Sequence, residues 1–246
     1  MNLSPKTFSL SINPTQADFR NMMEKNPRAK KTNKGNYSIQ TIVTARSSQS
    51  TFLVSKKTTG KPSITRKEYE RIASLQDHYL NRQERVMIEG YIGADPHFRV
   101  GCCLVVESSH ADIAAMQSQL YFPSDSQFTG KFTIIITPNL SAKGYPNQCL
   151  IAVDLEHWTT RILGSDYFGE SKKGGLRMWN HWVYQQGGLA LHAGCKVFQL
   201  GTRAEELALI IGLSGTGKTT TTFGQQMGSL PVQDDFCALF PSGKVY

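Results

Sequence analysis

The residues that most clearly suggest chemistry form a glycine-rich string, GLSGTGKTT, which directly follows the apolar run LALII at 207–211. Its Gly212, Gly217, Lys218 and Thr219 match the spacing G-x-x-x-x-G-K-[ST], which binds phosphate where a buried strand precedes it and a helix follows. Glycines permit positive φ and let backbone N–H groups approach phosphate oxygens, and the start of the helix favours the same anion. The string therefore predicts a nucleoside triphosphate site, in preference to an ordinary glycine-rich turn.

Two side chains of this string would act on the nucleotide itself. Lys218 would balance the charge of the β- and γ-phosphates. The Thr219 hydroxyl would bind a magnesium or manganese ion carried by the nucleotide, because hard divalent cations prefer oxygen ligands. The predicted nucleotide-binding residues of the string are Gly212, Leu213, Ser214, Gly215, Thr216, Gly217, Lys218, Thr219 and Thr220.

Two adjacent carboxylates follow the string. The segment LPVQDDF predicts a hydrophobic strand that ends in Asp234 and Asp235. A carboxylate at the end of a neighbouring strand can bind the metal of a nucleotide directly or through water. Such a pair standing alone is more often a solvated turn, but the phosphate loop before it favours the metal-binding interpretation.

Length and composition are those of a globular protein. With 246 residues, 39% of them apolar, the chain can bury a core in one large or two modest domains. No stretch approaches the roughly 18 consecutive apolar residues of a membrane helix, and no signal-peptide pattern opens the sequence. The five cysteines are an odd number without C-x-x-C spacing, which argues against a disulfide framework and for a cytoplasmic location.

The net charge of +8 is concentrated in basic clusters at 20–34 and 56–67. Nucleic-acid binding would need stacking aromatic residues among these charges, or a recognisable module. Neither cluster has them, so we interpret both as solvated surface that also attracts anionic substrates modestly. We expect neither nucleic acid nor a membrane as a partner, and the sequence leaves the oligomeric state open.

The elements that must position these residues do not follow a regular βαβ alternation, which predicts an α+β fold with a mixed sheet. Thr65 and Glu68 form a T-x-x-E capping box that begins an amphipathic helix through about Asn81. Other helices are predicted from near Ser109, in SKKGGLRMWNHWVYQQ after an opening loop, and in TTTTFGQQMGS up to about Gly228. Predicted strands are NYSIQTIVTAR, TFLVS, VMIEGYI, RVGCCLVVE, KFTIIIT, QCLIAVDLEH and TRILGSDYFG.

Several ordered strings together resemble the ATP-dependent phosphoenolpyruvate carboxykinase family. The phosphate loop GLSGTGKTT, the QDD after it, DYFGESKKGG upstream and the isolated LHAGC carry the resemblance most specifically. TARSSQSTFLV, YIGADPHFRV and FTIIITPNL extend it, so that it runs from about Asn36 to Tyr246.

The resemblance implies roles for side chains that would otherwise attract no attention. Arg46 corresponds to the family's substrate arginine, whose planar fork suits a carboxylate, and Tyr167 to its substrate tyrosine. His192 matches the family's metal-binding histidine. The implied catalytic residues are Lys172, Lys173 and Lys218; the substrate-binding residues are Arg46, Tyr167 and Lys173; the metal ligands are Lys173, His192, Asp235, Thr219 and Asp234, with His192 also counted in the nucleotide site.

The implied reaction is decarboxylation of oxaloacetate followed by phosphoryl transfer from ATP, which gives phosphoenolpyruvate, CO₂ and ADP and belongs to gluconeogenesis. The implied cofactors are ATP with Mn²⁺, Mg²⁺ or both. Two departures from the family pattern affect the surroundings of the site: Ser48, Gln49, Ser50 and Thr51 replace a charged run, and Phe236 follows the two aspartates.

We expect a polar, basic and partly flexible segment at 1–35, a substrate-binding domain at 36–203, and the start of a P-loop nucleotide domain at 204–246. Two strands and a helix do not bury an independent core, so we expect the chain to be a truncated piece of the enzyme. The alternatives are a non-catalytic nucleotide-binding or regulatory relative, and a P-loop kinase of the HPr-kinase kind.

Overall fold

The computed structural model describes residues 8–45, 48–55, 62–198 and 206–246. They divide into two compact units, within Met1–Trp179 and Asn180–Tyr246. This division lies upstream of the domain boundary expected after residue 203, because the strands at 189–198 pair with strands further along the chain.

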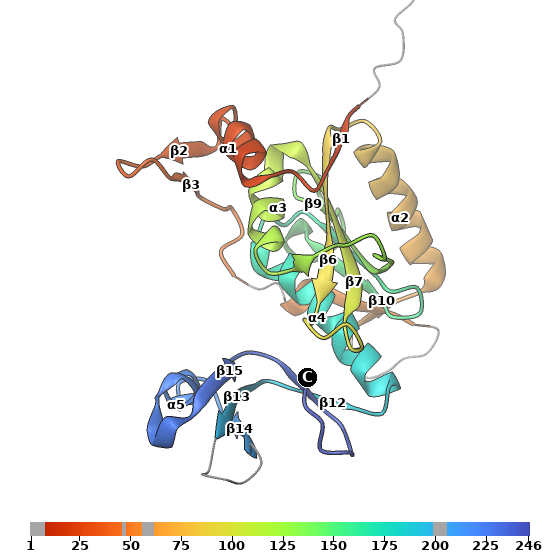
Figure 1. The fold of residues 1–246 in the computed structure, drawn as a ribbon. Helices are drawn as coiled ribbons and strands as arrows, with labels where there is room; N and C mark the ends of the chain where they lie inside the picture. Colours follow the sequence, from red (N-terminus) through yellow and green to blue (C-terminus); the bar gives the residue numbers. More distant parts are fainter. Residues whose placement is uncertain (1–7, 46–47, 56–61, 199–205) are drawn as a thin grey trace, which may run out of the picture. The chain divides into compact units, whose positions relative to one another are not determined.

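A nine-stranded sheet forms the centre of the first unit (Figure 1). Its strands are β1 (Leu10–Ile12), β4 (Thr51–Val54), β5 (Ser63–Ile64), β6 (Arg85–Ile92), β7 (Val100–Glu107), β8 (Phe122–Pro123), β9 (Gly130–Thr137), β10 (Leu150–Asp154) and β11 (Thr159–Leu163). The order is β1-β6-β7-β9-β11-β10-β4-β5, with β8 also paired to β6. Along this order β6/β7 and β10/β11 are antiparallel and the other neighbours are parallel. The mixed sheet agrees with the predicted α+β class.

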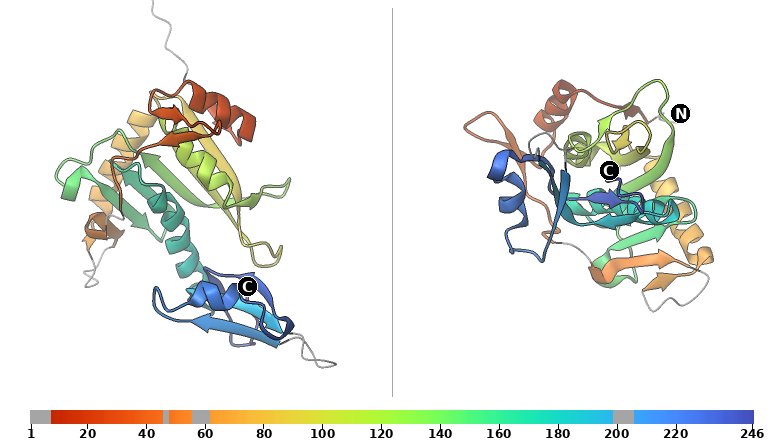
Figure 2. Two further views of the ribbon diagram at one scale, coloured as in Figure 1. Left: turned by 90° about the vertical axis from the view of Figure 1, so that its left-hand side faces the viewer. Right: turned by 60° about the horizontal axis from the view of Figure 1, so that its bottom comes forward.

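Helices cover both faces of this sheet (Figures 1 and 2). On one face α2 (Arg66–Leu80) packs Ile72 in a cluster with Leu150 and Leu163. On the other face α4 (Phe168–Gln185) lies so close to β11 that a Cβ added at Gly174 would be 3.2 Å from Thr160 Cγ2. Thr160 and Leu163 are three positions apart on one strand, so their side chains point to opposite faces. α3 (Ala111–Ser118) packs on β6 and β7 and is joined to α4 by a hydrogen bond from Ser171 to Gln117.

The start of α2 confirms the predicted helix and half of its capping box. Thr65 is the N-cap, and its Oγ1 accepts a hydrogen bond from Glu68 N at 3.2 Å. The Glu68 carboxylate binds Arg71 and Tyr145 instead of returning to the Thr65 amide. A reciprocal capping box does occur at Thr15, where α1 (Gln16–Glu24) begins, although the sequence interpretation did not include it.

Three local expectations were wrong. The opening SKKGG was expected to be a loop, but it lies inside α4, because its glycines allow the helix to approach the sheet closely. The strand expected at 36–46 is limited to β3 (Tyr37–Ile39), which pairs with β2 (Ala29–Lys31) as a separate hairpin. The strand expected through TRILGSDYFG ends with β11 at Leu163, since Gly164 turns the chain with φ of 69°.

Residues upstream of 36 contribute to the first unit. β1 pairs in parallel with β6 at the edge of the sheet, and α1 contacts α3. The short 3-10 turns of the first unit are η1 (Ser48–Ser50), η2 (Ser108–His110) and η3 (Pro146–Gln148). None of the helices in the described part of the chain is both long and apolar enough to cross a membrane.

The described residues of the second unit form two small sheets and the short helix α5, in addition to the end of α4 (Figure 2). β13 (Ala193–Phe198) lies between β14 (Glu206–Ile211) and β15 (Leu230–Gln233), and β12 (Leu189–Leu191) pairs with β16 (Cys237–Leu239). α5 (Lys218–Phe223) ends earlier than the predicted limit near Gly228, because Gly224 is extended and a separate turn, η4 (Gln226–Gly228), follows. α5 packs directly on β13: a Cβ built at Gly194 would be 1.8 Å from Thr222 Oγ1.

This contact predicts that Gly194→Ala lowers the free energy of unfolding of the second unit by about 2 kcal/mol, because the added methyl group displaces α5 from the strand. Thr222→Ala removes the nearest atom, so the cost of Gly194→Ala should be smaller in a Thr222→Ala background. Hydrogen exchange of the α5 amides in the four proteins measures both effects. Equal costs of Gly194→Ala in the two backgrounds would contradict this packing.

Candidate nucleotide and metal site

The glycine string forms the turn between β14 and α5, so a strand and a helix flank it as the motif requires. The strand is half-buried to exposed, not buried as expected. Gly215 and Gly217 have φ of 79° and 90°, values that residues with a Cβ rarely adopt. Thr216 tightens the turn, because its Oγ1 donates a hydrogen bond to Leu213 O at 2.8 Å. The backbone of the string is therefore shaped by its own residues before any ligand contact.

Lys218 is turned back over this loop. Its Nζ donates hydrogen bonds to Gly212 O at 2.7 Å and to Leu213 O at 3.1 Å. Both partners are neutral carbonyl groups. An anionic phosphate is a stronger partner for an ammonium group than a carbonyl, so the Lys218 ammonium can exchange these bonds for phosphate oxygens.

A buried lysine holds the C-terminal end of α5. Lys196 on β13 is 1% exposed, and its Nζ donates to Thr221 O at 2.9 Å, to Gly224 O, and to Gln226 Oε1 at 3.1 Å. These acceptors include carbonyl groups at the C-terminal end of α5, which the helix itself cannot satisfy and whose partial negative charge favours a cation. The sequence interpretation missed Lys196; the one available signal was a single charge inside the otherwise apolar string AGCKVF.

The two aspartates lie in a turn after β15, not within the strand as expected, because Gln233 folds the chain there. Gln233 Oε1 accepts hydrogen bonds from Asp235 N at 2.7 Å and Phe236 N at 3.1 Å. The Asp235 carboxylate lies 3.7 Å from His192 Nε2. The His192 ring is stacked on Phe236, with centroids 5.7 Å apart and an interplanar angle of 6°.

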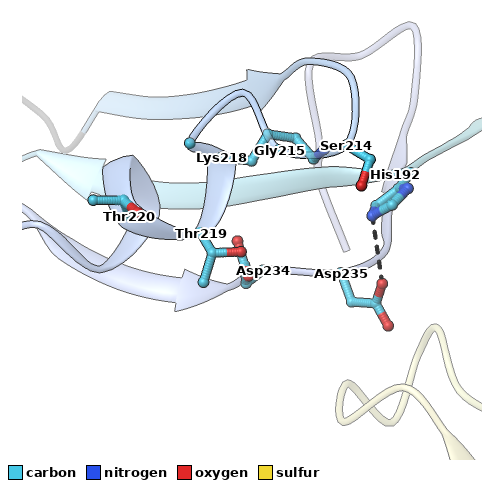
Figure 3. A pocket seen from close by; sticks show the side chains of 9 residues that line it. His192, Ser214, Gly215, Lys218, Thr219, Thr220, Asp234 and Asp235 are labelled. Atoms are coloured by element: carbon cyan, nitrogen blue, oxygen red, sulfur yellow. Dashed lines mark ion pairs between the residues drawn. The ribbon is translucent and has the colours of Figure 1, made fainter.

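These side chains line one cavity of about 460 Å³ in the second unit (Figure 3). It is bounded by the phosphate loop and start of α5 on one side, and by the aspartate turn with His192 on the other. The lining residues are His192, Ser214, Gly215, Gly217, Lys218, Thr219, Thr220, Asp234 and Asp235. The cavity thus combines a positively charged loop with two carboxylates and an imidazole.

The residues proposed from the sequence are distributed over both units. The cavity gathers six of the nine residues of the glycine string, together with His192, Asp234 and Asp235. Gly212, Leu213 and Thr216 belong to the same loop, where they shape its turn and hold Lys218. Tyr167, Lys172 and Lys173 lie in the first unit, at the start of α4 and all half-buried. Arg46 lies outside the described residues.

The donor set of the cavity fits a divalent cation. Asp234 Oδ1 is buried and has no hydrogen-bond donor among the described residues, and a buried carboxylate oxygen without a partner is costly. Asp235 and Thr219 add oxygen donors and His192 adds a nitrogen. Oxygen ligands suit Mg²⁺, and a mixture of carboxylate and imidazole also suits Mn²⁺.

A second cluster of possible ligands, in the first unit, is already neutralised. Asp154, Glu156 and His157 place one donor atom each within 4.8 Å of one another. The Arg66 guanidinium binds both Asp154 and Glu156, and it therefore supplies the positive charge that a metal would provide. Burial alone would raise the pKa of the Asp154 carboxyl, but its hydrogen bonds from Arg66 and His157 lower it overall.

Comparison with known proteins now adds to this geometry. A family model described as phosphoenolpyruvate carboxykinase matches residues 9–241. The chain belongs to the phosphoenolpyruvate carboxykinase family. A protein named phosphoenolpyruvate carboxykinase (ATP) from Geobacillus kaustophilus is 31% identical to it over 65% of this chain and 30% of the relative's length. A protein of the same name from Bacillus subtilis is 30% identical over 72% of this chain and 36% of the relative's length.

A relative of the same name from Dictyostelium discoideum is 32% identical over 58% of this chain and 26% of its own length. The chain thus spans about a third of the length of the curated phosphoenolpyruvate carboxykinases that it matches. The family assignment agrees with the resemblance drawn from the sequence strings.

The contacts of Lys196 predict that Lys196→Met increases the exchange of amide hydrogens at the end of α5 and lowers the stability of the second unit by about 1–2 kcal/mol, because the Thr221 and Gly224 carbonyl groups lose a charged donor. Lys244→Met is the matched control, since Lys244 is exposed and its Nζ donates a hydrogen bond to Tyr246 Oη. Hydrogen exchange resolved by residue provides the measurement. Identical protection of α5 in the two variants would show that Lys196 does not hold the helix.

Proposed function

We propose that the protein acts as an ATP-dependent phosphoenolpyruvate carboxykinase, converting oxaloacetate and ATP into phosphoenolpyruvate, CO₂ and ADP. The observation that carries this proposal is the cavity in which the phosphate loop meets His192, Asp234 and Asp235, in a chain of this family. Participation in gluconeogenesis and a cytoplasmic location belong to the same proposal.

In the first step the bond between the carboxylate carbon and the methylene carbon of oxaloacetate breaks. CO₂ leaves, and the electron pair moves onto the neighbouring carbonyl group to give an enolate. In the second step the enolate oxygen takes the γ-phosphoryl group of ATP, and ADP leaves. Both steps build negative charge at defined oxygens, so fixed positive charge and alignment of the reactants supply most of the acceleration.

The residues of the cavity have complementary tasks in this reaction. The backbone amides of 214–218 and the Lys218 ammonium would hold the phosphates, and the Thr219 hydroxyl and Asp234 would face the nucleotide's cation. His192 and Asp235 would hold the second cation. A divalent cation bound there supplies a fixed positive charge beside the enolate oxygen.

The substrate would be held by residues of the first unit and its flanking segment. Arg46 offers a planar pair of donors for a carboxylate, and Tyr167 a phenolic hydroxyl. Lys172 adds a positive charge next to Lys173, which suits a dianionic substrate. These roles follow from the positions that match the family strings.

The nucleotide part of the proposal predicts that the chain binds Mn²⁺-ATP and that Lys218→Met weakens this binding by at least about tenfold, because one charged hydrogen bond to phosphate is lost. Lys244→Met should bind normally. Isothermal titration of the three proteins with Mn²⁺-ATP provides the test. Equal affinity in all three proteins would show that Lys218 of the phosphate loop does not bind the nucleotide.

The chemical part predicts that the intact enzyme, of which we expect this chain to be a piece, forms phosphoenolpyruvate from oxaloacetate only when both ATP and Mn²⁺ are present. Asp235→Asn should reduce the rate by at least about tenfold, because a charged ligand is lost. A coupled assay of phosphoenolpyruvate measures it. Retained Mn²⁺-ATP binding without turnover would instead favour a non-catalytic nucleotide-binding relative.

A further inference from the structure

The histidine of the cavity has an exposed side chain, so burial does not orient its ring. The His192 side chain is 62% exposed. Its backbone is well fixed, because it lies between Leu191, the last residue of β12, and Ala193, the first residue of β13, and both of these residues are paired in sheets. The orientation of the imidazole therefore depends on the contacts of the ring itself.

The pairing of β12 with β16 brings Phe236 opposite this histidine. The antiparallel register joins Leu191 to Cys237. One step further, the same register sets His192 opposite Phe236, and side chains directly opposite each other on neighbouring strands are close enough to interact. The two rings are nearly parallel, with centroids 5.7 Å apart and an interplanar angle of 6°. The stack therefore follows from the register of this small sheet.

The backbone of Phe236 is held at both of its polar groups by one side chain. Gln233 Oε1 accepts a hydrogen bond from Phe236 N at 3.1 Å, and Gln233 Nε2 donates to Phe236 O. The same amide accepts from Asp235 N at 2.7 Å and donates to Cys237 Sγ at 2.9 Å. A primary amide has two acceptor and two donor positions, so all of them are used within this turn. Phe236 is therefore a fixed surface against which the exposed imidazole packs.

With its ring against Phe236, His192 presents Nε2 to Asp235. Nε2 lies 3.7 Å from Asp235 Oδ1 (Figure 3), and both side chains line the cavity with the phosphate loop. Two donor atoms that are each about 2.1 Å from one cation lie roughly 3–4 Å apart. A nitrogen and a carboxylate oxygen at this separation can bind one ion with little movement, as long as the imidazole keeps its orientation.

A phenyl ring suits the task of keeping that orientation. It has no donor or acceptor that would compete for a cation, and parallel aromatic rings attract each other beyond the area that they bury. A ligand side chain that is already oriented binds a metal more tightly, because its supporting contacts hold the productive geometry. Phe236 is also a departure from the family pattern in the sequence, and the stack gives this departure a physical role.

We propose that Phe236 is a positioning residue for the cation site: its ring holds the His192 imidazole in the orientation in which Nε2 and the Asp235 carboxylate bind one divalent cation. Phe236 itself does not touch the cation. This inference rests on the proposed function, in which His192 and Asp235 hold the second cation. Mn²⁺ is the informative probe, since it accepts imidazole nitrogen, whereas Mg²⁺ prefers oxygen ligands.

Phe236→Leu tests the stack, because leucine keeps an apolar side chain but removes the flat ring. Phe236→Tyr retains the ring and should therefore retain the binding. Phe240→Leu is the matched control: it breaks an aromatic pair with Tyr246 whose centroids are also 5.7 Å apart, and Phe240 lies outside the lining of the cavity. His192→Gln removes the side chain through which Phe236 is proposed to act.

Three quantities are measured in the full chain: the Kd of Mn²⁺ from the EPR signal of the free ion, the broadening of the His192 ring signals by Mn²⁺ in NMR spectra, and the Kd of Mg²⁺-ATP. In Phe236→Leu we expect the Mn²⁺ Kd to rise by about three- to tenfold, the effect of one aromatic pair, and the His192 signals to need more Mn²⁺ for the same broadening. Phe236→Tyr and Phe240→Leu should resemble the unaltered chain. The Mg²⁺-ATP Kd should stay unchanged in all three variants.

The double variant shows whether Phe236 acts through His192. In a His192→Gln background, Phe236→Leu should cause no further change in the Mn²⁺ Kd. A further loss of the same size in that background would overturn the positioning role.

The remaining outcomes separate this inference from the proposed function. A Mn²⁺ Kd that rises in His192→Gln but not in Phe236→Leu would overturn the positioning role and leave the cation site standing. An unchanged Mn²⁺ Kd in His192→Gln would remove the histidine from the cation site, and would overturn both. Weaker Mg²⁺-ATP binding in Phe236→Leu would reveal a general loss of structure and would also overturn the positioning role.

Discussion

The close approach of α5 to β13 is the constraint on which the candidate site depends. The phosphate loop enters from β14 and leaves through α5, so its shape is fixed only if both ends are fixed. β14 is held by its antiparallel pairing with β13 along six residue pairs. α5 packs closely on β13 because Gly194 has no side chain and leaves room for Thr222. The buried Lys196 ammonium also holds α5, because it donates to carbonyl groups at the end of the helix. A glycine and a lysine that no ligand would touch thus determine where the phosphate-binding amides point.

The same strand connects the two sides of the cavity. His192 directly precedes β13, and Gln233, opposite Cys195 in the sheet register, folds the turn that carries Asp235. The imidazole and the carboxylate are therefore placed by one short sheet and not by long flexible loops. Their ion pair is exposed on both sides and long at 3.7 Å, so it contributes little to stability. The arrangement stabilises the fold weakly, but it places an imidazole and a carboxylate on the lining of the cavity, where a ligand site needs them.

Local signals made much of this architecture predictable, and contacts between distant residues account for the rest. The Thr65 cap, the apolar alternation of the central strands and the glycine spacing of the phosphate loop each depend on neighbours within a few residues, and each gave the correct element. The strand expected at 36–46 was wrong because its β-branched pattern is satisfied only at 37–39, whereas the amides at 42–43 donate to the buried Asp166 carboxylate. Lys196 and Asp166 could not be identified as anchors, since their partners lie 25 or more residues away. A charged residue inside an apolar string was the only indication for the lysine.

At the start of α4, the string SKKGG combines two lysines expected to act on the substrate with two glycines that pack against the sheet. Two adjacent glycines in SKKGG favour a loop, because each costs a helix about 1 kcal/mol relative to alanine. In the structure a Cβ at Gly174 would be 3.2 Å from Thr160 Cγ2, and one at Gly175 would be 3.2 Å from Ile92 Cδ1. Burial of the helix against the sheet offsets the glycine cost, and a Cβ at either position would force a neighbouring side chain to shift by a few tenths of an ångström. The glycines therefore set the depth of the helix while Lys172 and Lys173, one turn or less before them, stay half-buried. Packing against the sheet and the placement of the two lysines therefore depend on the same turn of α4.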